Sequence, residues 1–173
     1  MIEASYHRFL SLFDAHLRQY PYLMGNRPGA SDFAVFGQLT QLTHFDPTPM
    51  ALTLATAPRV FAWVDLIEDL SGAEPADADW ITGDNVPPTL RALLAELACG
   101  YVPVMIANAA ALRAGADRVE TLVDGKPWVQ QPFPYQGKCL LWLRESFARL
   151  GEDDQRRVSD LLDEAGCRAL LSN

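Results

Sequence analysis

Seven stretches of this 173-residue sequence repeat apolar side chains at intervals of three and four positions. That spacing gathers the apolar side chains on one face of an α-helix, and such a face must be buried against another surface. In the first stretch the face consists of Tyr6, Phe9, Leu10, Phe13 and Leu17. The sequence therefore predicts an all-α helical bundle with about seven helices, at residues 3–18, 33–42, 58–70, 87–97, 102–114, 132–150 and 152–165.

Two segments depart from the helical pattern. Residues 119–131 read VETLVDGKPWVQQ, two extended runs on either side of the dipeptide Asp124-Gly125. This dipeptide favours the two-residue turn of a small β-hairpin, and Pro127 keeps the second run at an edge. Residues 44–51 read HFDPTPMA, and we interpret their two prolines as an interruption after the second helix.

Length and composition suit one compact domain. With 49% apolar residues, the chain can bury a sizeable core. We expect a single helical domain over residues 1–173, made of a core at 1–70 and a C-terminal helical extension at 87–173. Residues 71–86 are rich in Asp, Ala, Gly and Pro and predict a surface connection.

The charge pattern argues against nucleic acid and membrane partners. Lysine and arginine number 14 against 22 aspartates and glutamates, a formal net charge of −8, and no stretch clusters basic residues with aromatic ones. The N-terminus has no apolar run flanked by positive charge, and the most apolar segment, residues 101–112, is too short for a span and contains Asn108. We therefore expect neither a secretory signal nor a membrane span, and a cytoplasmic location.

Residues with metal-binding or nucleophilic chemistry are scattered. The three cysteines are far apart and fit reduced thiols, and the three histidines have no ligand-like spacing, so we expect no metal site. The thiol of Cys139 is expected to be buried and inert, because two leucines follow it in a helical context. The acidic runs suit helix termini and surface turns better than acid–base catalysis. The side chains considered are Cys99, Cys139, Cys167, His7, His16, His44, Asp46, Asp65, Glu152, Asp153 and Asp154.

A helix start is encoded in the stretch PYLMGNRPGASDF, residues 21–33. Gly29 stands at the expected N-cap position and Asp32 follows three residues later. From there the Asp32 carboxylate can accept a hydrogen bond from the free N–H at the cap and oppose the positive end of the helix dipole. We expect Gly29 and Asp32 to form a structural helix cap.

This stretch resembles the C-terminal helical domain of the glutathione S-transferase superfamily. Its members carry a glycine, three variable residues, a serine or threonine cap, one more variable residue, and then alanine and aspartate. Gly25 and Asp32 match this pattern, whereas Gly29 replaces the hydroxyl cap and Ser31 replaces the alanine. The resemblance covers residues 6–70. Beyond residue 86, the stretch DGKPWVQQPFPYQGKCLLWLR resembles an extended tail of some bacterial transferase-like proteins.

The resemblance also implies a missing half. Family members begin with a thioredoxin-like domain that binds glutathione and supplies the residue that activates its thiol, and this sequence shows neither. It therefore implies a hydrophobic-substrate-side domain that is not catalytically competent alone. Glutathione would be its co-substrate only if a thioredoxin-like domain is present in cis, and the chain itself would hold no cofactor. Whether the chain is an enzyme therefore stays open.

Three explanations for the missing half stay open: a fragment of a longer transferase, a coding sequence that starts further upstream, or a free-standing helical module. We expect the first. In the third case the resemblance implies a non-catalytic protein-interaction module, as in translation elongation factor and aminoacyl-tRNA synthetase assemblies. Helix faces left without their usual partner would be covered by the later helices or by a second copy of the chain in a homodimer.

A candidate substrate-binding site lies after the expected hairpin. Aromatic faces with polar groups nearby suit a small organic ligand, and five such side chains gather in residues 128–138. In the alternative interpretation, Phe133 and Trp142 belong to the core. Tyr135 and the glutamines then form hydrogen bonds with the loop backbone, and Lys138 is solvated. The candidate site residues are Trp128, Gln131, Phe133, Tyr135 and Lys138.

Overall fold

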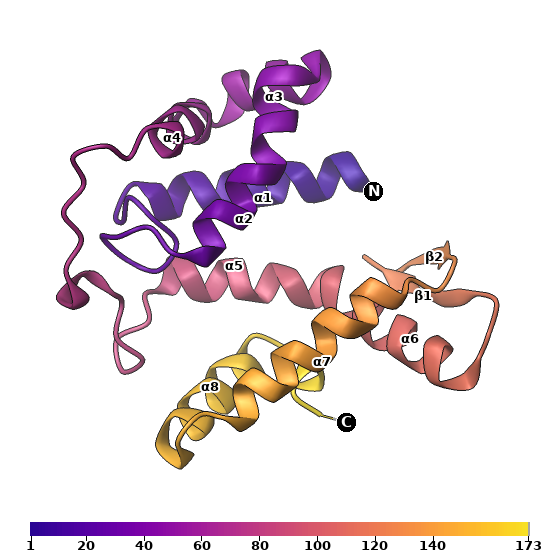
Figure 1. Ribbon diagram of the computed structural model, residues 1–173. Coiled ribbons are helices and arrows are strands. Elements are labelled where there is room, and N and C mark those ends of the chain that lie inside the picture. The colour runs from indigo at the N-terminus through magenta and orange to yellow at the C-terminus, as the bar shows by residue number, and fades with distance from the viewer. Residues whose placement is uncertain (173) are drawn as a thin grey trace. The chain divides into compact units, whose positions relative to one another are not determined.

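The computed structural model describes residues 1–172, which divide into two compact units, Met1–Leu90 and Arg91 to the C-terminus (Figure 1). The boundary falls inside helix α5 (Pro88–Cys99) and not in the predicted connection at 71–86. The fold is all-α with one small antiparallel hairpin, as the sequence predicts. That the two units behave as one domain stays a prediction.

The N-terminal unit is built on α1 (Ile2–Leu17), α2 (Ala30–Thr40), α3 (Pro47–Thr56) and α4 (Pro58–Glu68). Helix α4 packs against the other three. At the centre, the rings of Phe13 and Trp63 meet edge to face with centroids 4.9 Å apart, and the Trp63 indole N–H donates to the Pro21 carbonyl at 2.9 Å. The buried apolar side chains of this unit include Leu10, Phe13, Leu39, Val60, Trp63, Val64 and Ile67.

Helix α3 corrects the interpretation of residues 44–51 as an interruption, and brings the α-helices of the described residues to eight. Its two prolines occupy the first turn, where backbone N–H groups have no partner within the helix and proline costs little. The Asp46 side chain caps the helix by accepting the Thr48 N–H at 3.0 Å. A π-helical turn, Gln41–Phe45, joins α2 to this cap.

The predicted connection at 71–86 is mostly exposed, but one part of it is attached to the loop before α2. The Asn26 N–H donates to the Asp79 carbonyl at 2.8 Å, and the Ile81 N–H donates to the Met24 carbonyl at 2.7 Å. Between these bonds Trp80 forms a bridge with Gly25. The loop and the connection therefore hold each other in place.

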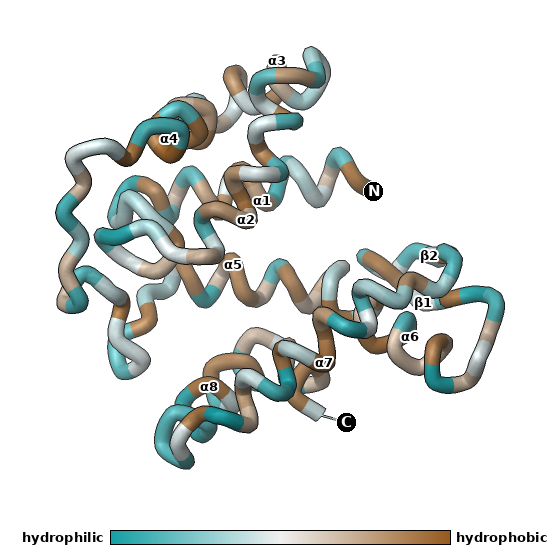
Figure 2. Tube along the Cα trace, viewed as in Figure 1, coloured by the Kyte–Doolittle hydropathy of each residue, from teal (hydrophilic) through white to brown (hydrophobic). Residues whose placement is uncertain are grey.

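The C-terminal unit contains the rest of α5, α6 (Tyr101–Ala114), β1 (Val119–Val123), β2 (Lys126–Gln130), α7 (Pro134–Ala148) and α8 (Glu152–Glu164). The hairpin turns at Asp124 and Gly125, both with positive φ, as the sequence predicts. Hydrophilic and hydrophobic positions both occur along α8 in Figure 2, which fits a surface helix. The core of this unit consists of Val102, Met105, Leu140, Ala165, Cys167 and Leu170.

Among the described helices, none is by itself long and apolar enough to cross a membrane. Two bent helix pairs, α3 with α4 and α5 with α6, reach the required length and composition only when taken together.

Candidate functional site

Asp32 ties a loop to the start of α2. Its side chain is fully buried; Oδ2 accepts the Gly29 N–H at 2.9 Å and Oδ1 accepts the Leu23 N–H at 2.8 Å. One carboxylate therefore satisfies two backbone donors and lies at the positive end of the helix dipole. This is the capping geometry expected from the spacing of Gly29 and Asp32, and it leaves the carboxylate no access to a ligand.

Trp80 gives a physical reason for glycine at this cap. A Cβ atom on Gly29 would lie 3.1 Å and 3.2 Å from two carbons of the Trp80 ring, tighter than ordinary contacts. The Arg27 guanidinium lies 4.5 Å from the centre of the same ring, and it also pairs with Asp77 at 3.1 Å. A serine or threonine cap would therefore have to displace the Trp80 ring by a few tenths of an ångström, which the local sequence could not reveal.

The predicted ligand site is only partly assembled. Phe133, Tyr135 and Lys138 lie together with Trp142 at the start of α7: the Phe133 and Tyr135 rings are 6.2 Å apart, and those of Tyr135 and Trp142 are 6.4 Å apart. The Lys138 Nζ lies 4.7 Å from the Trp142 ring centre. We refer to Phe133, Tyr135, Lys138 and Trp142 as the α7 aromatic cluster.

The other two predicted residues stand apart from the cluster. The Trp128 indole N–H donates to the Gln130 side chain at 3.0 Å, and the Gln130 amide donates to Gln136 at 3.1 Å, so a chain of hydrogen bonds links β2 to α7. Gln131 is exposed and makes no hydrogen bond with the residues described. Trp128 therefore supports the junction, while Gln131 contributes no visible contact.

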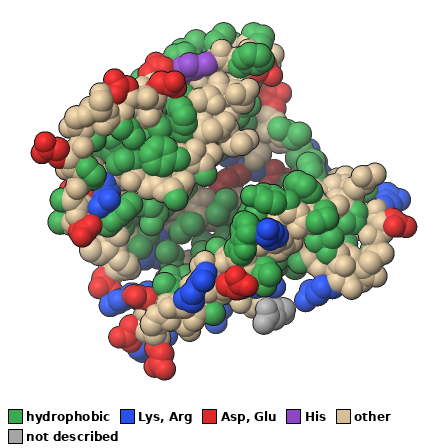
Figure 3. Space-filling model, viewed as in Figure 1, with side chains coloured by type: hydrophobic (Ala, Val, Ile, Leu, Met, Phe, Trp, Pro, Cys, Tyr) green, Lys and Arg blue, Asp and Glu red, His purple; other side chains and the backbone are tan. Residues whose placement is uncertain are grey.

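The α7 aromatic cluster is a surface feature. Phe133 is 50% exposed and Trp142 is 45% exposed, so neither belongs to the core. Hydrophobic side chains are accordingly visible at the surface in the region of α7 in Figure 3. Amphipathic rings at a surface can take part in ligand or protein contacts.

Asn108 fixes the position of this cluster, a role that sequence reasoning missed. The side chain is fully buried in α6; its Nδ2 donates to the Phe133 carbonyl at 3.0 Å and its Oδ1 accepts the Phe133 N–H at 2.7 Å. The Asn108 side chain supplies a partner for the Phe133 N–H and a second donor to the Phe133 carbonyl, which also accepts the Gly137 N–H at 3.4 Å. The signal was a single asparagine in the most apolar stretch of the sequence.

His16 is a buried structural residue. Its Nε2 lies 3.1 Å from the Tyr22 carbonyl oxygen, which can only accept, so Nε2 carries the hydrogen and Nδ1 accepts from the Thr89 hydroxyl at 2.9 Å. Burial lowers the pKa of His16, more than the backbone bonds and the nearby Asp32 charge raise it. The neutral ring is therefore fully satisfied where it lies.

His44 belongs to a local polar network on the π-helical turn. Its Nε2 lies 2.7 Å from Asp65 Oδ1 and its Nδ1 lies 2.7 Å from Thr43 Oγ1, and the ring stacks on Phe61. The Thr43 hydroxyl is fully buried and donates to the Leu39 carbonyl at 2.9 Å, so it is not presented as a nucleophile. This network joins the π-helical turn to α4.

The three thiols differ in their burial. Cys167 is fully buried, its Sγ lies 3.3 Å from the Leu94 carbonyl oxygen, and burial raises the pKa of the thiol. Cys139 is half-buried instead of the expected full burial, because its position on α7 only borders the core, and Cys99 is exposed. Within residues 1–172, no three His, Cys, Asp or Glu side chains come together as metal ligands.

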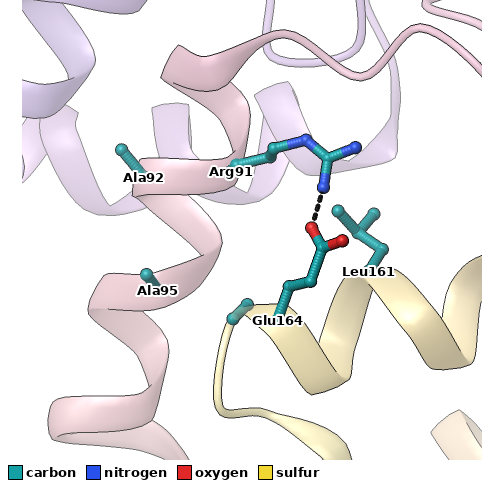
Figure 4. A pocket seen from close by; sticks show the side chains of 6 residues that line it. Arg91, Ala92, Ala95, Leu161 and Glu164 are labelled. Atoms are coloured by element: carbon teal, nitrogen blue, oxygen red, sulfur yellow. Dashed lines mark hydrogen bonds and ion pairs between the residues drawn. The ribbon is translucent and has the colours of Figure 1, made fainter.

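An ion pair spans a small, open pocket between α5 and α8. Arg91 of α5 and Glu164 of α8 meet across it, and Ala92, Ala95 and Leu161 line the remainder (Figure 4). The charges of Arg91 and Glu164 are paired with each other, and the other lining side chains are apolar. We therefore interpret these residues as a contact between α8 and α5.

Residues 2–66 match the family model of the glutathione S-transferase C-terminal domain. The match runs from α1 into α4 and contains the Asp32 cap, so the resemblance carried by Gly25 and Asp32 is confirmed for this part of the chain. The transferase-type segment thus lies entirely within the N-terminal unit. No curated protein and no solved structure matches the chain significantly.

Proposed function

We propose that this chain supplies the hydrophobic-substrate side of a glutathione S-transferase-like protein and is not catalytically competent alone. The observation that carries the proposal is the match of residues 2–66 to the C-terminal domain of that family. Glutathione would then bind on a thioredoxin-like domain joined to this chain in cis, in the cytoplasm.

The state of the hydroxyl and thiol groups supports this proposal. Activation of a thiol requires a neighbour that stabilises the thiolate. Burial raises the pKa of Tyr6 more than its 2.7 Å hydrogen bond with Thr53 lowers it, and burial also raises the pKa of Tyr101. Both raised pKa values reflect burial of the tyrosine hydroxyl groups. Surroundings of this kind stabilise a thiolate poorly.

The test is a conjugation assay on the purified chain with glutathione and 1-chloro-2,4-dinitrobenzene. We expect the rate to equal that of the uncatalysed reaction, and we expect no retention on immobilised glutathione. Conjugation that scales with the concentration of the chain would refute the proposal. Joining the chain to a thioredoxin-like domain encoded upstream should restore both retention and conjugation, and failure to do so would also count against it.

A non-catalytic protein-interaction module is the second candidate, favoured by the exposure of the α7 aromatic cluster. Its simplest partner is a second copy of the chain. Light scattering at several concentrations would then show a dimer, and the double substitution Tyr135→Ser and Trp142→Ser would shift it to monomer. A wild-type chain that stays monomeric at every concentration would remove the homodimer from consideration.

A further inference from the structure

A groove between α6 and α7 combines an apolar lining with two arginines. Its volume is about 330 Å³, at the small end of the range of about 300–1,000 Å³ typical of ligand pockets. Leu112 of α6 and Leu140 and Leu141 of α7 supply much of the apolar lining. At Gly137 a Cβ atom would lie 2.6 Å from Leu112 Cδ1, so the Leu112 side chain lies directly against the α7 backbone here.

The arginines are Arg113 of α6 and Arg144 of α7, and both line the groove. The Arg144 Nε donates to the Leu170 carbonyl at 3.1 Å, which orients its guanidinium. Burial and, secondarily, the charge of Arg113 lower the pKa of Arg144. The two cations are therefore close enough to repel each other.

No carboxylate within the described part of the C-terminal unit pairs with either arginine. Elsewhere in this unit Arg118 pairs with Glu120 at 3.2 Å, and Arg91 and Arg156 also pair with acidic side chains. The two cations belong to a chain with a formal net charge of −8. A carboxylate is the natural partner for such a pair, since guanidinium groups bind it with two parallel hydrogen bonds.

We propose that the groove between α6 and α7 binds a small amphiphilic monocarboxylate. The carboxylate lies between Arg113 and Arg144, and the apolar body lies against Leu112, Leu140 and Leu141. This inference does not depend on the proposed transferase role, because the groove lies outside the matched residues 2–66.

The first test is calorimetric titration of the full chain with octanoate. We expect saturable binding of one octanoate per chain. Acetate, which lacks the apolar body, and octanol, which lacks the charge, should each bind at least about tenfold more weakly. The absence of octanoate binding, or equal binding of octanol, would overturn the proposal.

The second test uses variants of the arginines. Arg113→Gln and Arg144→Gln should each weaken octanoate binding at least about tenfold, because each removes a charge-assisted hydrogen bond. Arg144→Lys should retain part of the affinity. The matched control is Arg118→Gln, an exposed arginine of the same unit outside the groove, which should bind octanoate as the wild type does.

Arg113→Gln is the decisive variant, because Arg113 makes no hydrogen bond that the described fold depends on, whereas Arg144 holds the Leu170 carbonyl. Circular dichroism should show unchanged helix content for it. If folded Arg113→Gln binds octanoate as tightly as the wild type, or if Arg118→Gln loses as much affinity, the proposal is wrong.

Discussion

Replacing Gly25 with alanine should be among the most damaging single substitutions in the N-terminal unit. Gly25 has φ +131°, a conformation that side-chain-bearing residues rarely adopt. A Cβ atom there would lie 2.2 Å from the Asp79 carbonyl oxygen and 2.9 Å from the Ile81 nitrogen. Both contacts are with backbone atoms, which cannot swing aside as a flexible side chain would.

The cost can be worked out from two parts. Backbone strain at such a position costs about 1–3 kcal/mol. Moving the connection away also weakens the bonds Asn26 N–H to Asp79 carbonyl and Ile81 N–H to Met24 carbonyl, each worth about 0.5–1.5 kcal/mol. We therefore expect a loss of about 3 kcal/mol, which for a chain of this size lowers Tm by about 6–12 °C.

Urea unfolding of Gly25→Ala measures this loss, with Gly37→Ala as the matched control. Gly37 lies in α2 with no atom within 4 Å of the position of its Cβ. Alanine there should be neutral or stabilise the protein by up to about 1 kcal/mol. A Gly25→Ala variant that unfolds within about 0.5 kcal/mol of Gly37→Ala would refute the close backbone approach.

Three further substitutions or conditions test the buried polar groups. Asp32→Ala should destabilise the chain by about 2–4 kcal/mol, because two backbone N–H groups lose their partner. Thermal unfolding measures this loss, and a loss under about 1 kcal/mol would contradict the capping role. Since burial lowers the pKa of His16, the unfolded chain takes up a proton first, so stability should fall as pH drops below about 6.5. His16→Gln should flatten that slope in urea titrations while exposed His7→Gln should not, and equal slopes for all three proteins would contradict it. Asn108→Leu should cost about 1–3 kcal/mol by leaving the Phe133 N–H without its partner, and an unchanged urea midpoint with unchanged tryptophan fluorescence would show that Asn108 does not position the cluster.

Local patterns in the sequence determined most of the secondary structure. Apolar spacing predicted α1 and α8 to within about two residues at each end, and Asp124-Gly125 predicted the hairpin turn. The spacing from Gly29 to Asp32 predicted the cap at the start of α2. These features depend on interactions between residues close in sequence, so a single sequence contains their whole cause.

Helix α3 shows how the same information can be misinterpreted. Two prolines suggested an interruption, although in the first turn of a helix proline is well tolerated. The α1 face shows a second limit: Phe13 and Leu10 are fully buried as expected, but the polar His16 joins them, because Thr89 and the Tyr22 carbonyl satisfy its ring. Periodicity identifies a buried face without identifying its polar members.

Tertiary structure alone decided the features that involve residues far apart in sequence. Trp80 lies over Gly29, Asn108 holds Phe133, and Arg113 and Arg144 line the same groove. No spacing rule connects these pairs, since each depends on how a loop or a helix returns to a distant one. The sequence by itself determined the helices, the hairpin and the transferase-type segment, whereas the exposed aromatic cluster and the arginine groove arise only when α6 and α7 are packed together.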